Sequence, residues 1–155
     1  MLGRTYDGQV CSVARTLELV GERWTLLIVR DALMGVARFD GFLARLPIAR
    51  NVLADRLNGL VDNGILERVA YQDRPPRYEY HLTPRGRDLL PVIVTLTEWG
   101  DRHLAGESGP PREFEHVPCG GRVVSALVCE THDHPVPLDE VTSRPGPGSP
   151  SRASA

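Results

Sequence analysis

The sequence contains no lysine, few cysteines and no long hydrophobic run. Lysine is absent from its 155 residues, so all 18 basic residues are arginine. The three cysteines are an odd number at uneven spacing, which does not indicate a disulfide framework. Apolar runs stay well short of the roughly 18 residues that a membrane-spanning helix needs. The sequence therefore predicts neither a disulfide-stapled scaffold nor a membrane protein.

Targeting and catalytic motifs are also missing. The segment MLGRTYDGQVCSV lacks the apolar centre and the small-residue cleavage site of a secretion signal, so we expect a cytoplasmic protein. The sequence has no nucleotide-binding loop, paired-carboxylate motif or nucleophile elbow. A cysteine and one of the five histidines could act as nucleophile and base, but nothing in the sequence brings them together. We predict that the protein is not an enzyme.

Composition and charge are those of an ordinary globular domain with one basic region. Apolar residues make up 41% of the chain and charged residues 25%, which predicts one main soluble domain. The net charge is −2 overall, but residues 38–87 hold nine arginines against six acidic residues, a local charge of +3. This concentration of positive charge is a modest electrostatic indication of nucleic-acid binding.

Residues 38–86 have the pattern of a helix-turn-helix followed by a β-hairpin. Each of two predicted helices carries an apolar stripe at helical spacing: Phe39, Phe42, Leu43 and Leu46 in the first, and Leu53, Leu57, Leu60 and Val61 in the second. Pro47 ends the first helix, and Asn63 with Gly64 ends the second. Strands are predicted at 66–72 and 78–82, joined by a Pro-Pro turn. The pattern predicts a winged helix-turn-helix.

The remaining chain supplies further helices and an extension. Helices are predicted at 11–19, from 22 to Gly35, and from 83 to 104, where Pro91 should kink the last helix or delay its regular start. The predicted fold class is mostly α (α+β), with about five helices, a two-stranded wing and a small C-terminal β-hairpin. We assign residues 1–105 to the winged domain, 106–141 to the extension and 142–155 to a disordered Pro/Gly/Ser-rich tail. Residues 1–9 should form a loose arm.

Short patterns in a characteristic order complete the assignment. They are Cys11, residues 21–24, Arg38, Phe39, Leu53, Leu57, residues 63–66, Arg68, Pro75, Pro76, Tyr78, Tyr80, residues 82–86, Leu90, Pro91, Trp99 and Gly100. Over roughly residues 8–104 the sequence resembles the HxlR family of winged-helix transcriptional regulators. It departs from the usual family pattern at Ser12, at Glu22 and Arg23, and at Ala49, where Ser or Thr usually caps the second helix.

The second helix of the pair supplies the candidate DNA-reading residues. The major groove admits one helix, whose N-terminal residues reach the base edges. Here those residues are Arg50, Asn51, Asp55 and Arg56. Arginine can form paired hydrogen bonds with guanine and asparagine with adenine, whereas Asp55 could orient an arginine. The alternative is that these are solvated surface residues.

The predicted wing offers a separate phosphate-binding element. Arg74 and Arg77 bracket Pro75 and Pro76, which places two cations on a stiff loop. Phosphate contacts of this kind position a protein on DNA without reading sequence. Arg38, at a helix start, is a further candidate. The alternative is a turn kept soluble by its charges.

The resemblance implies a homodimer built from the first and last helices. Dimers of this class bind two half-sites about one helical turn apart, so we expect a palindromic operator and a repressor. The apolar residues Leu96 and Trp99, with Gly100, are candidates for the dimer surface, although they could instead be buried in a monomer core. A winged helix that makes only protein–protein contacts is the rival function.

Cys11 is the candidate regulatory residue. It falls at a helix start, where unpaired N–H groups favour the thiolate, and Arg15 follows one turn later. The resemblance implies sensing of oxidants or electrophiles at this position, and a small molecule is a second class of effector. The alternative is a buried cysteine at the dimer interface.

The extension contains a candidate metal site. His116 and Cys119 form an H-x2-C pair, and Cys129 and His132 form a C-x2-H pair nine residues later. Some relatives in the family it resembles carry Cys-x-x-Cys at the second pair, where this chain has Cys129-x-x-His132. Tetrahedral zinc would suit these residue types and would stabilise a unit too small to fold alone. The alternative is a reduced hairpin with incidental His and Cys. No other cofactor is expected.

Overall fold

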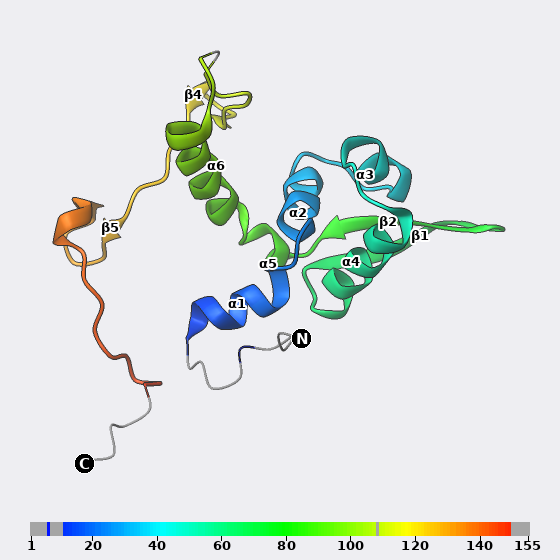
Figure 1. Cartoon of the computed structure of the whole chain (residues 1–155), viewed down its shortest axis with the longest axis horizontal. Helices are drawn as coiled ribbons and strands as arrows, with labels where there is room; N and C mark the ends of the chain where they lie inside the picture. The colour runs from blue at the N-terminus through cyan, green and yellow to red at the C-terminus, as the bar shows by residue number, and fades with distance from the viewer. Residues whose placement is uncertain (1–5, 7–10, 108, 150–155) are drawn as a thin grey trace. The chain divides into compact units, whose positions relative to one another are not determined.

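The computed structural model describes residue 6, residues 11–107 and residues 109–149. The chain divides into two compact units, Met1–Ile93 and Val94–Ala155. In chain order the elements are α1 (Ser12–Val20), α2 (Thr25–Leu33), α3 (Phe39–Arg45), α4 (Arg50–Asp62), β1 (Leu66–Asp73), β2 (Pro76–Leu82), α5 (Pro84–Arg87), α6 (Leu90–Leu104), β3 (Glu115–His116), β4 (Gly121–Arg122), β5 (Val128–Cys129), β6 (His134–Pro135) and the 3-10 turn η1 (Leu138–Glu140) (Figure 1). The fold is the winged helix-turn-helix that the sequence predicts.

Helices α3 and α4 form the helix-turn-helix. Leu46 and Ala49, on either side of the turn, have extended backbone, so each helix stops or starts cleanly at the predicted place. Ala49 is the N-cap residue of α4, and its side chain forms no hydrogen bond. The first backbone N–H groups of α4 therefore have no capping side chain. At the other end Gly64 takes a left-handed conformation with φ of 66°, as a helix-terminating glycine does.

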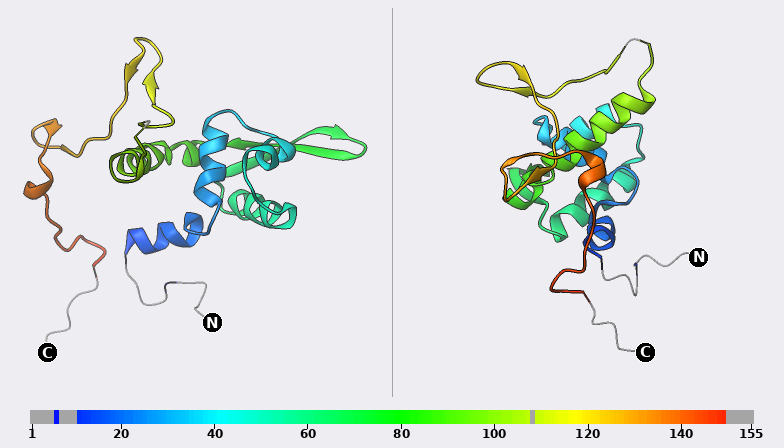
Figure 2. Two further views of the ribbon diagram at one scale, coloured as in Figure 1. Left: turned by 45° about the horizontal axis from the view of Figure 1, so that its top comes forward. Right: turned by 90° about the vertical axis from the view of Figure 1, so that its left-hand side faces the viewer.

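Strands β1 and β2 form the wing. They pair antiparallel from Leu66 opposite Leu82 to Asp73 opposite Pro76, with an irregularity between Ala70 and Gln72. The hairpin projects away from the helices of its unit, as the left view of Figure 2 shows. β2 begins earlier than predicted and includes Pro76, because the first position of a strand tolerates a residue without an N–H.

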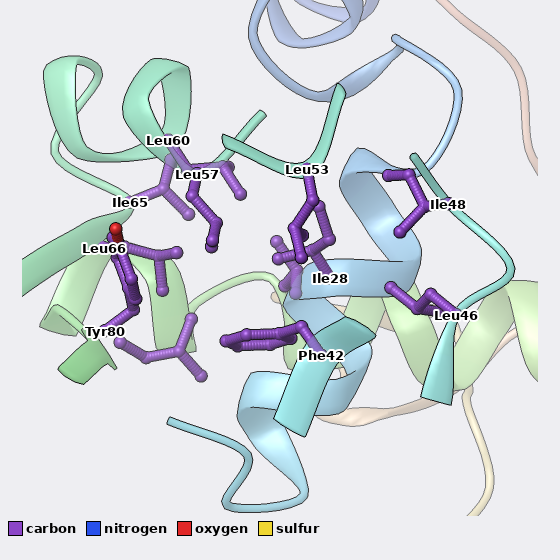
Figure 3. Packing of buried hydrophobic residues seen from close by; sticks show 12 residues of the cluster. Ile28, Phe42, Leu46, Ile48, Leu53, Leu57, Leu60, Ile65, Leu66 and Tyr80 are labelled. Atoms are coloured by element: carbon purple, nitrogen blue, oxygen red, sulfur yellow. The ribbon is translucent and has the colours of Figure 1, made fainter. Parts of the chain in front are cut away.

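A single apolar core positions α4. Phe42, Leu53, Leu57 and Ile28 are completely buried, and the phenyl ring of Phe42 lies among side chains from α2, α4 and the strands (Figure 3). The core also includes Val29, Leu46, Ile48, Leu60, Ile65, Leu66, Tyr80 and Leu82. The predicted stripes of both helices therefore face this core, and α2 is the buried central helix that its composition predicts.

Helix α2 starts later than predicted and carries a buried charge. Residues 22–24 form a turn, in which Trp24 has a left-handed φ of 81°, so the helix begins at Thr25. Asp31 on α2 is completely buried, and its carboxylate is paired with Arg30 at 2.9 Å and with Arg45 of α3 at 3.3 Å. This ion pair across two helices helps to fix α3 against the central helix.

The predicted helix from 83 to 104 is two helices. The Thr83 hydroxyl accepts a hydrogen bond from the Gly86 N–H at 3.0 Å and caps α5, which ends at Arg87. A new helix, α6, begins at Leu90, so Pro91 lies in its first turn, where its missing N–H costs no helical hydrogen bond. The proline thus separates two helices and leaves α6 regular.

The second unit corrects the prediction of one C-terminal hairpin. It holds two strand pairs, β3 with β4 and β5 with β6, because the chain turns back at a left-handed residue in each pair, Gly120 and Asp133. Ser125 lies in the segment between the two strand pairs. Its N–H, at 2.8 Å, and its hydroxyl both donate hydrogen bonds to the Glu98 carboxylate of α6. Both strand pairs are visible in Figure 2 in yellow and orange.

Two predicted terminal segments fall largely outside the described residues. Of the arm at 1–9 only Tyr6 is described, and its N–H donates to Glu18 at 2.8 Å. Of the tail at 142–155, residues 150–155 lie outside the described part. None of the described helices is long and apolar enough to span a membrane.

We expect Gly86→Ala to lower the free energy of unfolding by about 1–3 kcal/mol, the usual cost of overpacking. A Cβ at this position would clash with the carbonyl oxygen of Ile65, which belongs to the backbone and cannot move freely. Gly59→Ala, in the interior of α4 with no atom within 4 Å of the added carbon, should instead raise stability by about 0.5–1 kcal/mol. Urea denaturation of both variants measures the contrast, and equal stability of the two would contradict it.

Candidate nucleic-acid interface

The outward face of α4 carries polar side chains at helical spacing. Asn51, Asp55 and Asn58 are exposed on the side opposite the buried leucines of the helix. The side chains of Asn51 and Asp55 form no hydrogen bond or ion pair within the described residues, so both are available to a ligand. Asn58 was not among the predicted site residues, although its i+7 spacing from Asn51 was the signal that identifies it.

Arg50 begins α4 and is exposed but not free. Its terminal nitrogen lies 3.1 Å from Asp40 Oδ1, and its guanidinium lies 5.3 Å from the ring centroid of Phe39. The side chain of Arg50 is 67% exposed and that of Asp40 is 79% exposed. An ion pair this exposed is worth little, so a base or phosphate can compete for Arg50.

Arg56 occupies a different environment from the one predicted. Its terminal nitrogen donates to Glu22 Oε2 at 2.8 Å and its Nε donates to the Arg23 carbonyl at 3.4 Å, and only 24% of the side chain is exposed. These contacts tie α4 to the turn that precedes α2. Arg56 therefore serves as an anchor of the helix. Asp55 pairs with no arginine in the described chain, so the structure shows no orienting role for it.

The wing tip presents Arg74 and Arg77 to solvent. Both are exposed, and the side chain of neither forms a hydrogen bond or ion pair among the described residues. The loop between the strands is closed by the Gln72 side-chain amide, which donates to the carbonyls of Arg74 at 3.2 Å and Pro75 at 3.0 Å. The two predicted cations thus sit free on a hydrogen-bonded tip, and Gln72 is the supporting residue that the sequence did not indicate.

Arg38 joins the start of α3 to the wing. Its Nε donates to Glu79 Oε1 at 2.9 Å, and its guanidinium lies 4.5 Å from the ring centroid of Tyr71. The neighbouring backbone adds a hydrogen bond from the Tyr80 N–H to the Ala37 carbonyl at 2.7 Å. The guanidinium hydrogen bond holds the pKa of Glu79 below its usual value. Arg38, predicted as a phosphate ligand, thus links α3 to the base of the wing, and its side chain remains 62% exposed.

This ion pair predicts an acid-dependent loss of stability. Because the pKa of Glu79 is depressed in the folded protein, its stabilising effect is present above the unfolded value of about 4.3 and is lost as the pH falls through the lower folded value. We expect Glu79→Gln to reduce this acid dependence. Urea midpoints at neutral pH and near pH 3 test it, and an unchanged dependence in the variant would count against the pair.

Cys11 lies at the predicted helix start. It is the N-cap residue of α1 and is exposed in the single chain. The backbone N–H groups of Ala14 and Val13 lower the pKa of its thiol. The thiolate is the nucleophilic form, so this position favours reaction with electrophiles.

The four predicted metal ligands form two separate pairs. His116 Nδ1 lies 3.1 Å from Cys119 Sγ, and His132 Nδ1 lies 3.3 Å from Cys129 Sγ. Within residues 11–107 and 109–149, no three His, Cys, Asp or Glu side chains are placed to share a metal ion. The single four-ligand site is therefore not formed in this structure, because each pair belongs to the turn of its own hairpin.

Apolar side chains remain exposed on the first and last helices. Val13 and Leu17 are exposed on α1, and Leu96 and Trp99 on α6, with Trp99 retaining 56% of its surface. Leu96 and Trp99 are therefore not buried within their own unit. Exposed apolar patches of this kind commonly mark contact surfaces.

Comparison with known proteins agrees with this arrangement. The profile of the HxlR-like helix-turn-helix family matches residues 19–108. An uncharacterized HTH-type transcriptional regulator of Mycobacterium tuberculosis is 45% identical over 147 residues, which cover 95% of this chain and 92% of that protein. The crystal structure of PA1607, described as a transcription factor, superposes with a TM-score of 0.78 at 30% identity and covers 88% of this chain and 96% of its own. The redox regulator HypR in its oxidized form gives a TM-score of 0.56 at 33% identity, over 62% of this chain and all of that one (100%).

These similarities identify the class of protein. The family and the named relatives are regulators of transcription and not enzymes, which confirms the prediction from the missing catalytic motifs. The helix-turn-helix, the projecting wing and the family match agree over the same residues. The chain belongs to the HxlR-like helix-turn-helix family and is a DNA-binding regulator of transcription.

Proposed function

We propose that the protein is a cytoplasmic repressor that binds a palindromic operator as a homodimer and is released from DNA by thiol chemistry at Cys11. The observation that carries the proposal is the exposed start of α4, where Arg50 and Asn51 stand beside unpaired backbone N–H groups. A helix presented in this way can enter the major groove with its first turn against the bases.

The wing supports a second contact with the same duplex. Arg74 and Arg77 carry charges without a partner in the described chain, on a hairpin that projects from the helices (Figure 1). Contacts from such a tip to phosphate fix the register of the protein on DNA. Asn51 then reads a base, and the arginines of the wing supply sequence-independent affinity.

The exposed apolar residues of α1 and α6 support dimerisation. One helix in one half-site gives few base contacts, whereas a two-fold dimer presents two helices to half-sites about one helical turn apart. Val13, Leu17, Leu96 and Trp99 are the residues that a second copy would cover. A dimer bound at a palindrome within a promoter would exclude polymerase from it.

The decisive experiment is footprinting on the DNA that flanks the protein's own gene. We expect protection of a palindrome, and a steep loss of binding as salt rises, because phosphate contacts release counterions from DNA. If no DNA is protected even at low salt, the rival function as a protein–protein module gains support and the proposal fails. The mass of the complex in solution then tests the dimer separately.

Cys11 provides the switch in this proposal. The related structure HypR is named a redox regulator, and here the thiol lies exposed at a helix start that lowers its pKa. With a hydroperoxide, the thiolate attacks one peroxide oxygen to give a sulfenic acid, and the other oxygen leaves as water or alcohol after taking a proton. The new polar group at the start of α1 would alter the helix proposed to form the dimer.

We expect Cys11→Ser to bind DNA normally and to lose the response to peroxide in a gel-shift assay. Ser12→Ala is the matched control because it changes the exposed residue beside Cys11 and leaves every thiol in place, and it should respond like the wild type. A wild-type response in Cys11→Ser would overturn the role of this cysteine while leaving operator binding intact.

A further inference from the structure

Two turns in the extension have the same backbone structure. In the turn at 116–120, the His116 carbonyl accepts hydrogen bonds from the N–H groups of Cys119 at 3.0 Å and Gly120 at 2.8 Å. Gly120 is left-handed with φ of 68°. The chain thereby folds back around the Cys119 sulfur. A Cβ on the next residue, Gly121, would lie only 3.3 Å from that sulfur, so the glycine at 121 makes room for it.

The turn at 129–133 repeats this arrangement with the ligand types reversed. The Cys129 carbonyl accepts from the N–H groups of His132 at 3.2 Å and Asp133 at 2.8 Å, and Asp133 is left-handed with φ of 52°. A left-handed non-glycine residue is uncommon, and aspartate is among the residues that tolerate it. The sequence thus builds one turn twice, each with a histidine and a cysteine three residues apart.

Each turn already holds its two side chains at a spacing that suits a metal. The Nδ1–Sγ distances are 3.1 Å at 116–119 and 3.3 Å at 129–132. Tetrahedral zinc binds sulfur at about 2.3 Å and imidazole nitrogen at about 2.0–2.1 Å, so two such ligands stand roughly 3.5 Å apart. Each pair therefore needs to open by only a few tenths of an ångström to bind one ion.

The extension has little else to stabilise it. From residue 105 to residue 149, none of the described residues is buried, and Val117, Val124 and Leu138 are among its exposed apolar side chains. Its strands are two residues long. A unit of this size without a core usually depends on a disulfide, a metal or another chain.

We propose that His116, Cys119, Cys129 and His132 together bind one Zn²⁺ in a Cys2His2 site. Zinc would coordinate both thiolates and both Nδ1 atoms, and the two thiol protons would be released to solvent. The turns at 116–120 and 129–133 that share the ion belong either to one chain or to two copies of the chain. Within one chain they are joined by residues 123–127, which have no regular structure.

Titration of the reduced full-length protein with Co²⁺ tests the site, because thiolate-bound cobalt absorbs light in a characteristic way. We expect thiolate-to-cobalt bands that saturate at one ion per chain and disappear when Zn²⁺ is added. Cys119→Ser and Cys129→Ser should each lose more than roughly 100-fold in metal affinity, the loss that even an outer-shell partner can cause. Cys11→Ser is the matched control and should bind like the wild type, since Cys11 lies in the other unit.

Several results would overturn the proposal. These are the absence of thiolate-to-cobalt bands in the wild type, full metal affinity in either extension variant, or equal loss in Cys11→Ser. DNA binding is not the readout, so the outcome is independent of the proposed repressor function. Circular dichroism of the variants separates loss of a ligand from loss of folding, and the exposed positions of the ligands predict unchanged helix content.

Mixing the two extension variants identifies the source of the second turn. If the site forms between two copies, each mixed dimer of Cys119→Ser and Cys129→Ser retains one of its two sites. Random exchange makes half of the dimers mixed, so the cobalt bands return to about a quarter of the wild-type intensity. If the site forms within one chain, neither variant has an intact set and mixing restores nothing. If the wild type binds cobalt through its thiolates, both outcomes are consistent with the four-ligand site. They differ only in which chain supplies the second turn.

Discussion

Replacement of Asn51 by alanine is expected to weaken binding to the operator by about 5- to 150-fold, which corresponds to the 1–3 kcal/mol of a paired base contact. Asn51 is exposed in the first turn of α4 and has no partner in the described chain, so the substitution removes no contact that holds the fold. Binding to unrelated DNA should not change, because phosphate contacts carry it. Gel-shift titrations on operator and random DNA measure both quantities.

Asn58→Ala is the matched control for this prediction. It removes the same side chain from the same exposed face of α4, nearly two turns further from the start of the helix. Only the first residues of a recognition helix reach base edges, so operator binding should stay near that of the wild type. Equal losses in the two variants, or equal losses on operator and random DNA, would show that Asn51 does not read a base.

The double variant Arg74→Ala/Arg77→Ala should weaken binding to operator and random DNA alike. Each phosphate contact contributes a slope of about −0.9 to the dependence of log affinity on log salt, so losing two contacts should reduce the slope by about 2. At about 0.1 M salt the same relation predicts a loss of roughly 60-fold. Binding measured over a series of salt concentrations gives the slope directly.

Arg112→Ala/Arg144→Ala provides a control with the same change in net charge. Arg112 lies in the extension and Arg144 in the tail, and both are exposed and outside the winged unit. If the wing acts through local phosphate contacts, this control should leave the salt slope unchanged. A similar reduction in both double variants would instead indicate that total charge determines affinity and that the wing tip makes no special contact.

The candidate arginines differ in how readily DNA could engage them. Arg74 and Arg77 have no partner in the described residues, whereas Arg50 has an exposed partner in Asp40 that a base or phosphate can replace. Arg38 and Arg56 are held by Glu79 and Glu22 in pairs that fix the wing and α4. Arg38 nevertheless remains 62% exposed and can offer charge to DNA, whereas Arg56, at 24% exposed, is largely covered.

The sequence by itself determined the elements of the winged unit. The apolar stripes of residues 39–46 and 53–61, the glycine at 64 and the Pro-Pro turn specify local structure through spacing and backbone preference alone. The first turn of α4, with Arg50 and Asn51, follows directly from these boundaries. The same local signals misplaced the start of α2 and merged α5 with α6, because helix ends depend on single residues such as Trp24 and Pro91.

Only the tertiary structure decided which charged residues are engaged. Arg56 meets Glu22 across 34 positions and Arg38 meets Glu79 across 41, and no periodic pattern encodes such pairs. In the extension, the spacing of His and Cys predicted each pair correctly, but whether the two pairs meet depends on how the hairpins are brought together. The local sequence determines the individual helices, strands and turns of this protein. Long-range packing determines which charged residues pair, because the partner of a residue depends on which distant segments of the chain meet in the fold.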